Sequence, residues 1–348
     1  MAGLKSLASS LRKKLHLGGK QCHSTGPSTS NGSIEPKVEP KASIPPAEPT
    51  PASEDAPKLP EVVPAAEMVV SASPQLLSTS LEGKVAVVTG SSRSIGAAIA
   101  KALGSQGAKV VVNYVNDSSA AQSVVDEIKT FDTTKSKGCD AIAVQADASK
   151  LEGGQKLLAE ATKTWGQVDI LVLNAGIMGS KPLAEVDEDF FDSHFEINVK
   201  VPVFLAKAAV PLMSTPGGRI IFFSTSLTGL TPVLPNALTY VASKGAVEQV
   251  ARVLAKDLGS RGLTVNTVSP GPVDTPLFRA GKPEEVIKKI AAQNPNNRVG
   301  LPEGTWSSSL LLIAIMTGSV DIAPMVAFVA SPAAQWINGQ NLRVNGVR

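Results

Sequence analysis

The stretch Lys84–Leu103, "KVAVVTGSSRSIGAAIAKAL", decides the fold of this chain. It begins with an apolar run, "KVAVV", and ends in a helix-forming run, "AAIAKAL". The turn between them, "TGSSRSIG", contains only two glycines, and Ser94 stands where a third is expected. A strand that turns directly into a helix places free N–H groups of the helix at the turn, where they favour an anionic phosphate. The stretch therefore predicts a phosphate-binding turn, with a plain strand-to-helix turn as the alternative.

The residues of the turn suit a nucleotide cofactor. Gly90 can adopt a tight backbone conformation, and Gly96 lets the helix pack closely on the strand. If the backbone at Ser94 requires a positive φ, the serine costs about 1 kcal/mol. The expected cofactor contacts within the turn are Gly90, Ser92, Arg93 and Ile95.

From Leu81 onward, short apolar strands alternate with helical stretches. Near-continuous Val, Ile and Leu runs separated by helices are typical of a parallel sheet covered on both faces. We therefore predict an α/β protein, with one doubly wound Rossmann-type domain over residues 81–348 and a seven-stranded parallel sheet. The expected strands are Lys84–Thr89, Lys109–Tyr114, Ala141–Gln145, Ile170–Leu173, Arg219–Phe223, Thr264–Val268 and Gln340–Val344.

The end of the second expected strand indicates which cofactor is used. An NAD-specific site usually has Asp or Glu there, which bonds the ribose 2′-hydroxyl. This strand ends instead in the uncharged Asn113 and Tyr114, and Asp117 lies beyond its end. A carboxylate would repel a 2′-phosphate, whereas Arg93 with neutral donors would hold it. The residues favour NADPH, with Asn113 and Tyr114 as further cofactor contacts.

Four polar residues in the second half form the candidate catalytic set. Tyr240 and Lys244 are four apart in the helical stretch "TYVASKGAV", so their side chains share one face. Ser226 lies 14 residues before Tyr240, just beyond an expected strand, and Asn198 lies upstream in "FEINVKVP".

These motifs, together with Asn-Ala-Gly at Asn174–Gly176 and the Pro-Gly turn at Pro270–Gly271, resemble those of the classical short-chain dehydrogenases/reductases. The resemblance runs from Leu81 to the C-terminus and keeps the family's order and spacing. Within the family, "VVNYVNDSS" and "GKPEEVIKKIAAQNPNNRVG" are most similar to the NADPH-dependent aldehyde and ketone reductases of fungi and plants.

The resemblance implies hydride transfer between NADP(H) and a ketone or aldehyde, or the reverse oxidation of an alcohol. Tyr240 would donate the proton to the developing alkoxide, and Lys244 would lower the pKa of Tyr240 by stabilising its phenolate. Ser226 would hydrogen-bond the carbonyl oxygen. By resemblance, Asn198 would hold a water that relays protons to Lys244.

Other cofactor contacts carry over by position. In addition to Tyr240 and Lys244, they are Asp147 and Ala148 near the adenine, Asn174, Ala175 and Gly176 at the ribose, and Pro270, Gly271, Val273 and Thr275 near the nicotinamide. The family usually has a second asparagine where this chain has Leu173.

Two other functions remain open: reduction of a carrier-linked 3-oxoacyl chain, and a non-catalytic NADP-binding sensor or scaffold. The expected substrate is a small hydrophobic carbonyl compound or alcohol, such as a polyketide or terpenoid ketone of secondary metabolism. The resemblance also implies a homotetramer.

The first 80 residues differ from the rest of the chain. Residues 1–34 are basic, with Leu4, Leu7, Leu11 and Leu15 at helical spacing and no acid before Glu35. This pattern fits a mitochondrial transit peptide, a weak membrane-surface anchor or a disordered basic tail. Ten prolines lie between residues 35 and 74, so residues 35–80 are predicted to be a disordered linker. A cytoplasmic location is expected, with mitochondria as the alternative.

Residues 304–320, "GTWSSSLLLIAIMTGSV", interrupt the family's pattern. They are either an enlarged substrate lid or a product of a retained intron or mistaken gene model, and the second interpretation is favoured. Asp321 then has the position of a helix N-cap separated from its usual lead-in.

The composition excludes several classes of protein. Hydrophobic residues make up 43% of the 348 residues, and the net charge of +3 is too small to argue for nucleic-acid binding. The longest apolar run, "LLLIAIM" at Leu310–Met316, is too short to span a bilayer. Two cysteines form no disulfide framework or zinc motif, and we expect no metal.

Overall fold

Seven strands form one parallel sheet in the order β3-β2-β1-β4-β5-β6-β7. The computed structural model describes residues 78–131, 138–231, 233–302 and 321–346. The expectations for residues 1–34, for nearly all of the linker 35–80 and for the insert 304–320 lie outside the described residues. The strands are β1 (Val85–Val88), β2 (Lys109–Tyr114), β3 (Asp140–Gln145), β4 (Ile170–Leu173), β5 (Arg219–Phe223), β6 (Thr264–Pro270) and β7 (Asn341–Val344).

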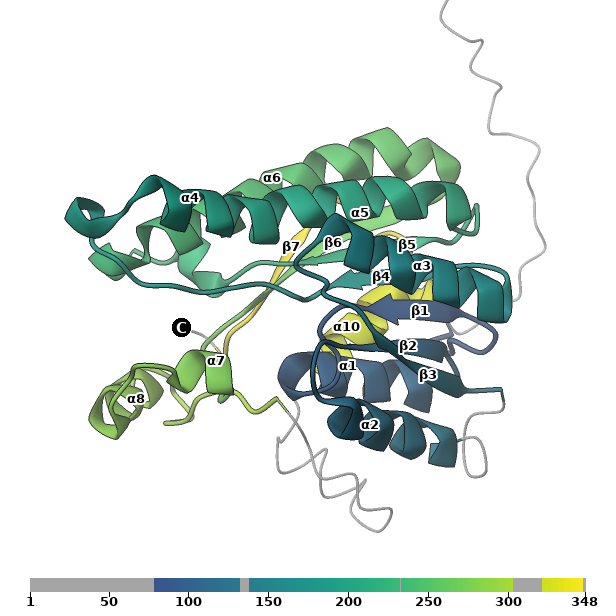
Figure 1. Ribbon diagram of the computed structural model, residues 1–348, viewed down its shortest axis with the longest axis horizontal. Coiled ribbons are helices and arrows are strands. Elements are labelled where there is room, and N and C mark those ends of the chain that lie inside the picture. The colour runs from purple at the N-terminus through teal and green to yellow at the C-terminus, as the bar shows by residue number, and fades with distance from the viewer. Residues whose placement is uncertain (1–77, 132–137, 232, 303–320, 347–348) are drawn as a thin grey trace, which may run out of the picture. The chain divides into compact units, whose positions relative to one another are not determined.

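Helices cover both faces of the sheet (Figure 1). One face packs against α1 (Ser94–Ser105), α2 (Ser118–Thr130) and α10 (Ala323–Ala330). The other packs against α3 (Leu151–Trp165), α5 (Val201–Ala209) and α6 (Leu238–Leu258). The described residues also form α4 (Glu188–Phe195), a π-helical turn at Glu196–Lys200, α7 (Pro276–Arg279), α8 (Glu284–Ala291) and several short 3-10 helices. The predicted doubly wound Rossmann-type fold is confirmed.

The strands form because their apolar runs are buried on both faces. Every residue of β1, "VAVV", and of β5, "RIIFF", is buried, which is the pattern of a parallel sheet between two helical layers. The seven predicted strands agree with the observed ones to within two residues at each end. The largest difference is at β6, which continues to Pro270, and there the Gly271 N–H donates to the Val344 carbonyl at 2.9 Å.

The order of the strands reverses between β1 and β4. The chain runs outward through β2 and β3 on one side of β1, then crosses to β4 on the other. In such sheets ligands bind beyond the carboxyl ends of the strands at this reversal. The turn after β1 and the Asn-Ala-Gly segment after β4 meet there. Among the described residues, no helix is long and apolar enough to cross a membrane.

Candidate active site

The turn after β1 has the geometry of a close strand-to-helix connection. Gly90 has a φ of +64°, and Ser94 has a φ of +52°, a conformation that serine rarely adopts. A Cβ on Gly96 would lie 2.1 Å from the Gly90 carbonyl oxygen, so only glycine fits. Both expectations, a tight turn at Gly90 and close packing at Gly96, are confirmed. Arg93 is exposed immediately before α1, with extended backbone.

Asn113 is buried beneath this turn. Its Oδ1 accepts a hydrogen bond from the Gly90 N–H at 2.8 Å, and its Nδ2 donates to the Ala146 carbonyl at 2.9 Å. The amide therefore joins the ends of β1 and β3 and holds the turn in place. Its predicted direct contact with a cofactor stays a prediction, as does that of the half-buried Tyr114. Asp117 accepts the Ala120 N–H and caps α2.

Asn174 likewise connects strand ends, where the strand order reverses between β1 and β4. Its Nδ2 donates to the Thr89 carbonyl at 2.9 Å, and the Thr89 hydroxyl accepts the Ala175 N–H at 2.9 Å. These bonds join the ends of β1 and β4, so the segment predicted to contact the ribose is fixed to the phosphate turn. Thr89 was not among the predicted cofactor contacts; the signal that could have found it was the Thr-Gly pair at the start of the turn.

Lys244 and Asn198 meet at Gly176. A Cβ on Gly176 would lie 2.9 Å from Asn198 Oδ1 and 3.4 Å from Lys244 Nζ. Lys244 is buried on α6, and its Nζ donates to the Phe223 carbonyl at the end of β5 at 2.8 Å. Asn198 lies in the π-helical turn, accepts the Ile177 N–H at 2.9 Å and donates to the Ile177 carbonyl at 3.0 Å. The structure thus brings together three of the predicted residues from separate elements.

Burial controls the protonation of the candidate acid and its neighbour. It raises the pKa of Tyr240 to about 12, and a hydrogen bond with the Thr225 side chain opposes this rise only in part. Burial also lowers the pKa of Lys244 to about 8. The net direction is opposite to the expected lowering, because the loss of hydration of the phenolate is the largest cause; the stabilisation of the phenolate by Lys244 stays a prediction.

Ser226 begins a short 3-10 helix, Ser226–Gly229, and is buried beside Thr225. The carboxylate of Glu248 on α6 holds this turn. It accepts hydrogen bonds from the Ser224 hydroxyl, at 2.7 Å, and from the Thr228 hydroxyl. The Ser224 hydroxyl also lies 3.2 Å from the Lys244 carbonyl oxygen. Sequence reasoning missed Glu248, although it lies one helical turn after Lys244 on the same face.

The remaining predicted contacts lie around the carboxyl edge of the sheet. Asp147 accepts hydrogen bonds from the Ser149 hydroxyl and N–H, and the hydroxyl bond is the main cause that lowers the pKa of Asp147. Ala148 is buried next to it. The Thr275 hydroxyl accepts the Phe278 N–H at 3.0 Å and caps α7. The predicted contacts of these residues with a cofactor stay predictions.

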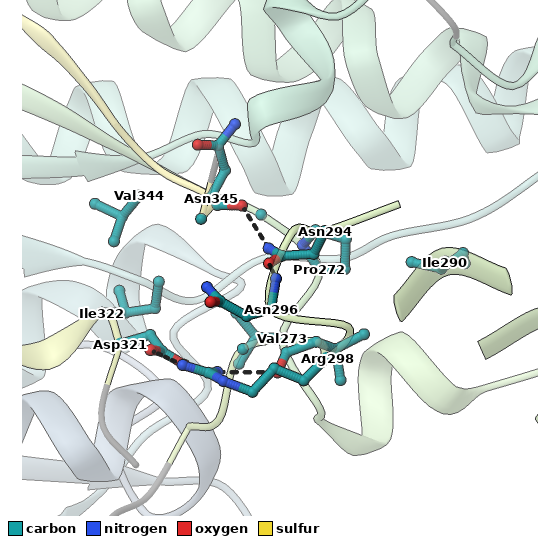
Figure 2. A pocket seen from close by; sticks show the side chains of 14 residues that line it. Pro272, Val273, Ile290, Asn294, Asn296, Arg298, Asp321, Ile322, Val344 and Asn345 are labelled. Carbon is teal, nitrogen blue, oxygen red and sulfur yellow. Dashed lines mark hydrogen bonds and ion pairs between the residues drawn. The ribbon is translucent and has the colours of Figure 1, made fainter. Parts of the chain in front are cut away.

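A cavity of about 140 Å³ adjoins Gly271 and Val273 (Figure 2). Its wall includes a bidentate ion pair between Arg298 and Asp321, with N–O distances of 2.7 and 2.8 Å. Asp321 also accepts the Leu301 N–H at 2.9 Å, so residues on the two sides of the insert are in direct contact. None of the four candidate catalytic residues lines this cavity. No group of three potential metal ligands occurs among the described residues.

Comparisons with known proteins identify the family of the chain. A family model described as Enoyl-(Acyl carrier protein) reductase matches residues 90–346. A versicolorin reductase of Emericella nidulans is 41% identical, over 76% of this chain and 96% of the relative. A probable tetrahydroxynaphthalene reductase of Zymoseptoria tritici is 38% identical, over 80% of this chain and 98% of the relative. A solved short-chain dehydrogenase from Burkholderia cenocepacia, in complex with NADP, has a TM-score of 0.65 at 33% identity and covers 76% of this chain and 98% of its own.

The chain therefore belongs to the short-chain dehydrogenase/reductase family, as its motifs predicted. It is an oxidoreductase and is similar to reductases of fungi.

Proposed function

We propose that the protein is an NADP(H)-dependent carbonyl reductase that interconverts a ketone or aldehyde and an alcohol. The observation that carries the proposal is the meeting of Lys244 and Asn198 at Gly176, with Lys244 one helical turn after Tyr240 on α6. A buried lysine beside a polar amide, on the same helix face as a half-buried tyrosine, is an arrangement suited to moving protons.

The residues at the carboxyl edge fit a phosphorylated dinucleotide. The start of α1 offers backbone N–H groups, and Gly96 allows the helix to approach the strand closely. Arg93 is exposed at this turn, and Asp117, the first carboxylate after β2, already caps α2. A 2′-phosphate would therefore meet a cation and no uncommitted carboxylate. The relative from Burkholderia cenocepacia, solved with NADP, supports the same choice.

The bound cofactor supplies the hydride, and this chain supplies the proton and the orientation. Because the pKa of Tyr240 is about 12, its hydroxyl stays protonated at neutral pH and can donate to the alkoxide. Lys244, with a pKa of about 8, stays charged at pH 7 and stabilises negative charge as the proton leaves. Ser226 hydrogen-bonds the carbonyl oxygen, and Asn198 holds the proton relay to Lys244.

The substrate is a hydrophobic carbonyl compound, and an aromatic polyketide is the class we favour. The two fungal relatives described above are named as reductases of versicolorin and of tetrahydroxynaphthalene. In this chain the segments around Tyr240 expose apolar side chains: Leu234 is 58% exposed, and Leu238, two residues before Tyr240, is 46% exposed. Exposed leucines beside a reactive tyrosine suit an apolar, ring-containing ligand.

The test is a Tyr240→Phe variant, assayed by NADPH oxidation against a panel of aromatic and aliphatic ketones. We expect turnover to fall by about 10³-fold while NADPH affinity stays unchanged, because only the proton donor is removed. The wild type should use NADPH in preference to NADH in the same assay. Near-normal turnover by the variant would refute the assignment.

The same panel separates the alternative functions. A 3-oxoacyl chain linked to a carrier protein is a second candidate, and preferential turnover of that substrate would replace the aromatic ketone. If the wild type binds NADPH tightly but reduces no carbonyl compound, the non-catalytic sensor or scaffold is the better description. The predicted homotetramer would be measured by sedimentation in parallel.

A further inference from the structure

A second concave surface lies at the opposite end of the sheet from the catalytic residues. We call it the amino-edge cavity: it has a volume of about 620 Å³, and its lining includes Lys84, Ile170, Arg219, Thr264 and Trp336. Ile170, Arg219 and Thr264 are the first residues of β4, β5 and β6, whereas the candidate catalytic residues follow the carboxyl ends of strands. The five-residue strand β5 separates the two ends by about 13 Å. The cavity is therefore separate from the proposed active site.

Arg219 is buried in the wall of this cavity and is only 5% exposed. Its Nη1 donates to the Gly218 carbonyl at 3.2 Å, and its buried Nε has no hydrogen-bond partner among the described residues. Within the same residues, no carboxylate forms an ion pair with it. Burial lowers the pKa of Arg219, and no other cause offsets this. A guanidinium nevertheless stays charged at neutral pH, so a cation lies here without a counter-charge.

Thr264 adds a second unpartnered group beside it. Arg219 pairs in register with Thr264 on one side and with Ile170 on the other, so the three side chains point to the same face of the sheet. The buried Thr264 Oγ1 also has no hydrogen-bond partner among the described residues. Buried polar groups are almost always hydrogen-bonded. Two unpartnered groups on adjacent strands, both lining one cavity, indicate a polar group of a ligand.

The charge of the lining restricts that ligand. Among the described residues, no Asp or Glu lines the amino-edge cavity, and the one other cation in its lining, Lys84, already pairs with Asp169 at 3.2 Å. One positive charge, that of Arg219, is therefore uncompensated. The surrounding walls are apolar, including Leu81 and Leu263, and Trp336 is 96% exposed at this surface. An exposed indole offers a flat face to an apolar or aromatic body.

We propose that the amino-edge cavity binds a molecule that carries a carboxylate on an apolar body. The carboxylate pairs with the Arg219 guanidinium and accepts from the Thr264 hydroxyl, while the apolar body lies along the leucines and Trp336. Guanidinium and carboxylate match in charge and in planar, two-bonded geometry. A phosphate monoester, with nearly two negative charges, would exceed the single uncompensated cation. This binding is independent of the proposed carbonyl reduction.

The test uses the full chain saturated with NADP⁺ and two matched probes, 4-phenylbutanoate and its neutral amide, followed by ligand-observed NMR titration. We expect the carboxylate to bind at least about tenfold more tightly than the amide, because only the carboxylate satisfies the cation. Arg219→Met should remove this preference. Thr264→Val should weaken carboxylate binding about threefold through the loss of one hydrogen bond. Tyr240→Phe should leave it unchanged, which separates this cavity from the active site.

Trp336→Ala is the second variant, because a side chain so exposed can be removed without loss of folding. This variant should weaken the binding of both probes equally. Leu183→Ala, 75% exposed on a different segment, is its control and should change neither affinity. If Arg219→Met fails to fold, Thr264→Val and Trp336→Ala carry the test. Equal binding of acid and amide, a loss of binding in Tyr240→Phe, or tighter binding of 3-phenylpropyl phosphate than of the carboxylate would overturn the proposal.

Discussion

In the turn after β1 the functional groups belong to the backbone, whereas in the turn after β5 and on α6 they belong to side chains. The geometry of the first region is set by backbone conformation, namely the positive φ of Gly90 and of Ser94, and by the lack of a Cβ at Gly96. The second depends on bonds between distant side chains, such as those of Glu248 to Ser224 and Thr228. The backbone region should therefore be sensitive to an added methyl group, and the side-chain region to a removed hydrogen-bond partner.

Adding one methyl group at Gly96 should have the largest effect. In Gly96→Ala the new Cβ would lie 2.1 Å from the Gly90 carbonyl oxygen, so strand and helix must separate. We expect a loss of about 3 kcal/mol in the free energy of unfolding and no measurable NADPH binding. Calorimetric unfolding and NADPH titration would measure the two effects. The matched control is Gly245→Ala on α6, where no described residue would lie within 4 Å of the added Cβ and a gain of about 1 kcal/mol is expected. Wild-type NADPH affinity in Gly96→Ala would contradict the backbone interpretation.

The buried charge of Lys244 should give stability a distinctive dependence on pH. Its pKa falls from 10.5 in the unfolded chain to about 8 in the folded protein. Between these values the unfolded chain holds the proton and the folded protein has lost it, so raising the pH favours folding. The free energy of unfolding of the wild type, minus that of Lys244→Met, should therefore rise from pH 8 to pH 10.5, by up to about 3 kcal/mol.

Denaturant titrations of both proteins at several pH values would measure this difference. The subtraction matters because Tyr240, whose pKa is raised to about 12, has the opposite effect above pH 10 in both proteins. A difference that stays flat or falls over this interval would show that Lys244 is not buried as a cation.

Removing the carboxylate of Glu248 tests the side-chain region directly. Glu248→Ala removes the carboxylate acceptor that the Ser224 and Thr228 hydroxyls share and leaves them only the backbone carbonyls of Lys244 and Thr225, so the turn that carries Ser226 should shift. We expect kcat to fall about tenfold with unchanged NADPH affinity. Glu248→Gln keeps an acceptor oxygen and should recover most of the activity. Gln249→Ala, exposed on the same helix, is the control and should behave as the wild type.

The smallest expected effect is at Ser94. Because Ser94 has a φ of +52°, Ser94→Gly should relieve about 1 kcal/mol of strain and keep or slightly tighten NADPH affinity. Ser92→Gly, at a position without positive φ, should give no such gain. Thermal unfolding and NADPH titration of both variants would measure the difference. A large loss of affinity in Ser94→Gly would mean that the hydroxyl has a separate task.

The sequence predicted the sheet well because each strand is a short apolar run that the parallel core buries on both faces, as in "VAVV" and "RIIFF". The sequence predicted strain at Ser94 only on the condition that the backbone there has a positive φ, and the observed φ of +52° meets that condition. The position of Glu248 relative to Ser224 was not predictable, because the two are 24 residues apart and meet only when α6 packs on the sheet. For the same reason the net direction of the Tyr240 pKa shift was predicted wrongly: burial is a property of the packed helix and not of the Tyr-Lys spacing.

The side-chain amide of Asn198 makes the two hydrogen bonds that a backbone peptide group normally makes in a sheet. By accepting from the Ile177 N–H and donating to the Ile177 carbonyl, its amide imitates the backbone of a neighbouring strand. Aspartate would lack the donor, leucine would lack both groups, and glutamine would be one methylene too long. Asn198 therefore holds the loop after β4 at Ile177 through two hydrogen bonds, in addition to the bonds at Asn174 and Ala175. The structural task of Asn198 is therefore separate from any part that it has in proton transfer.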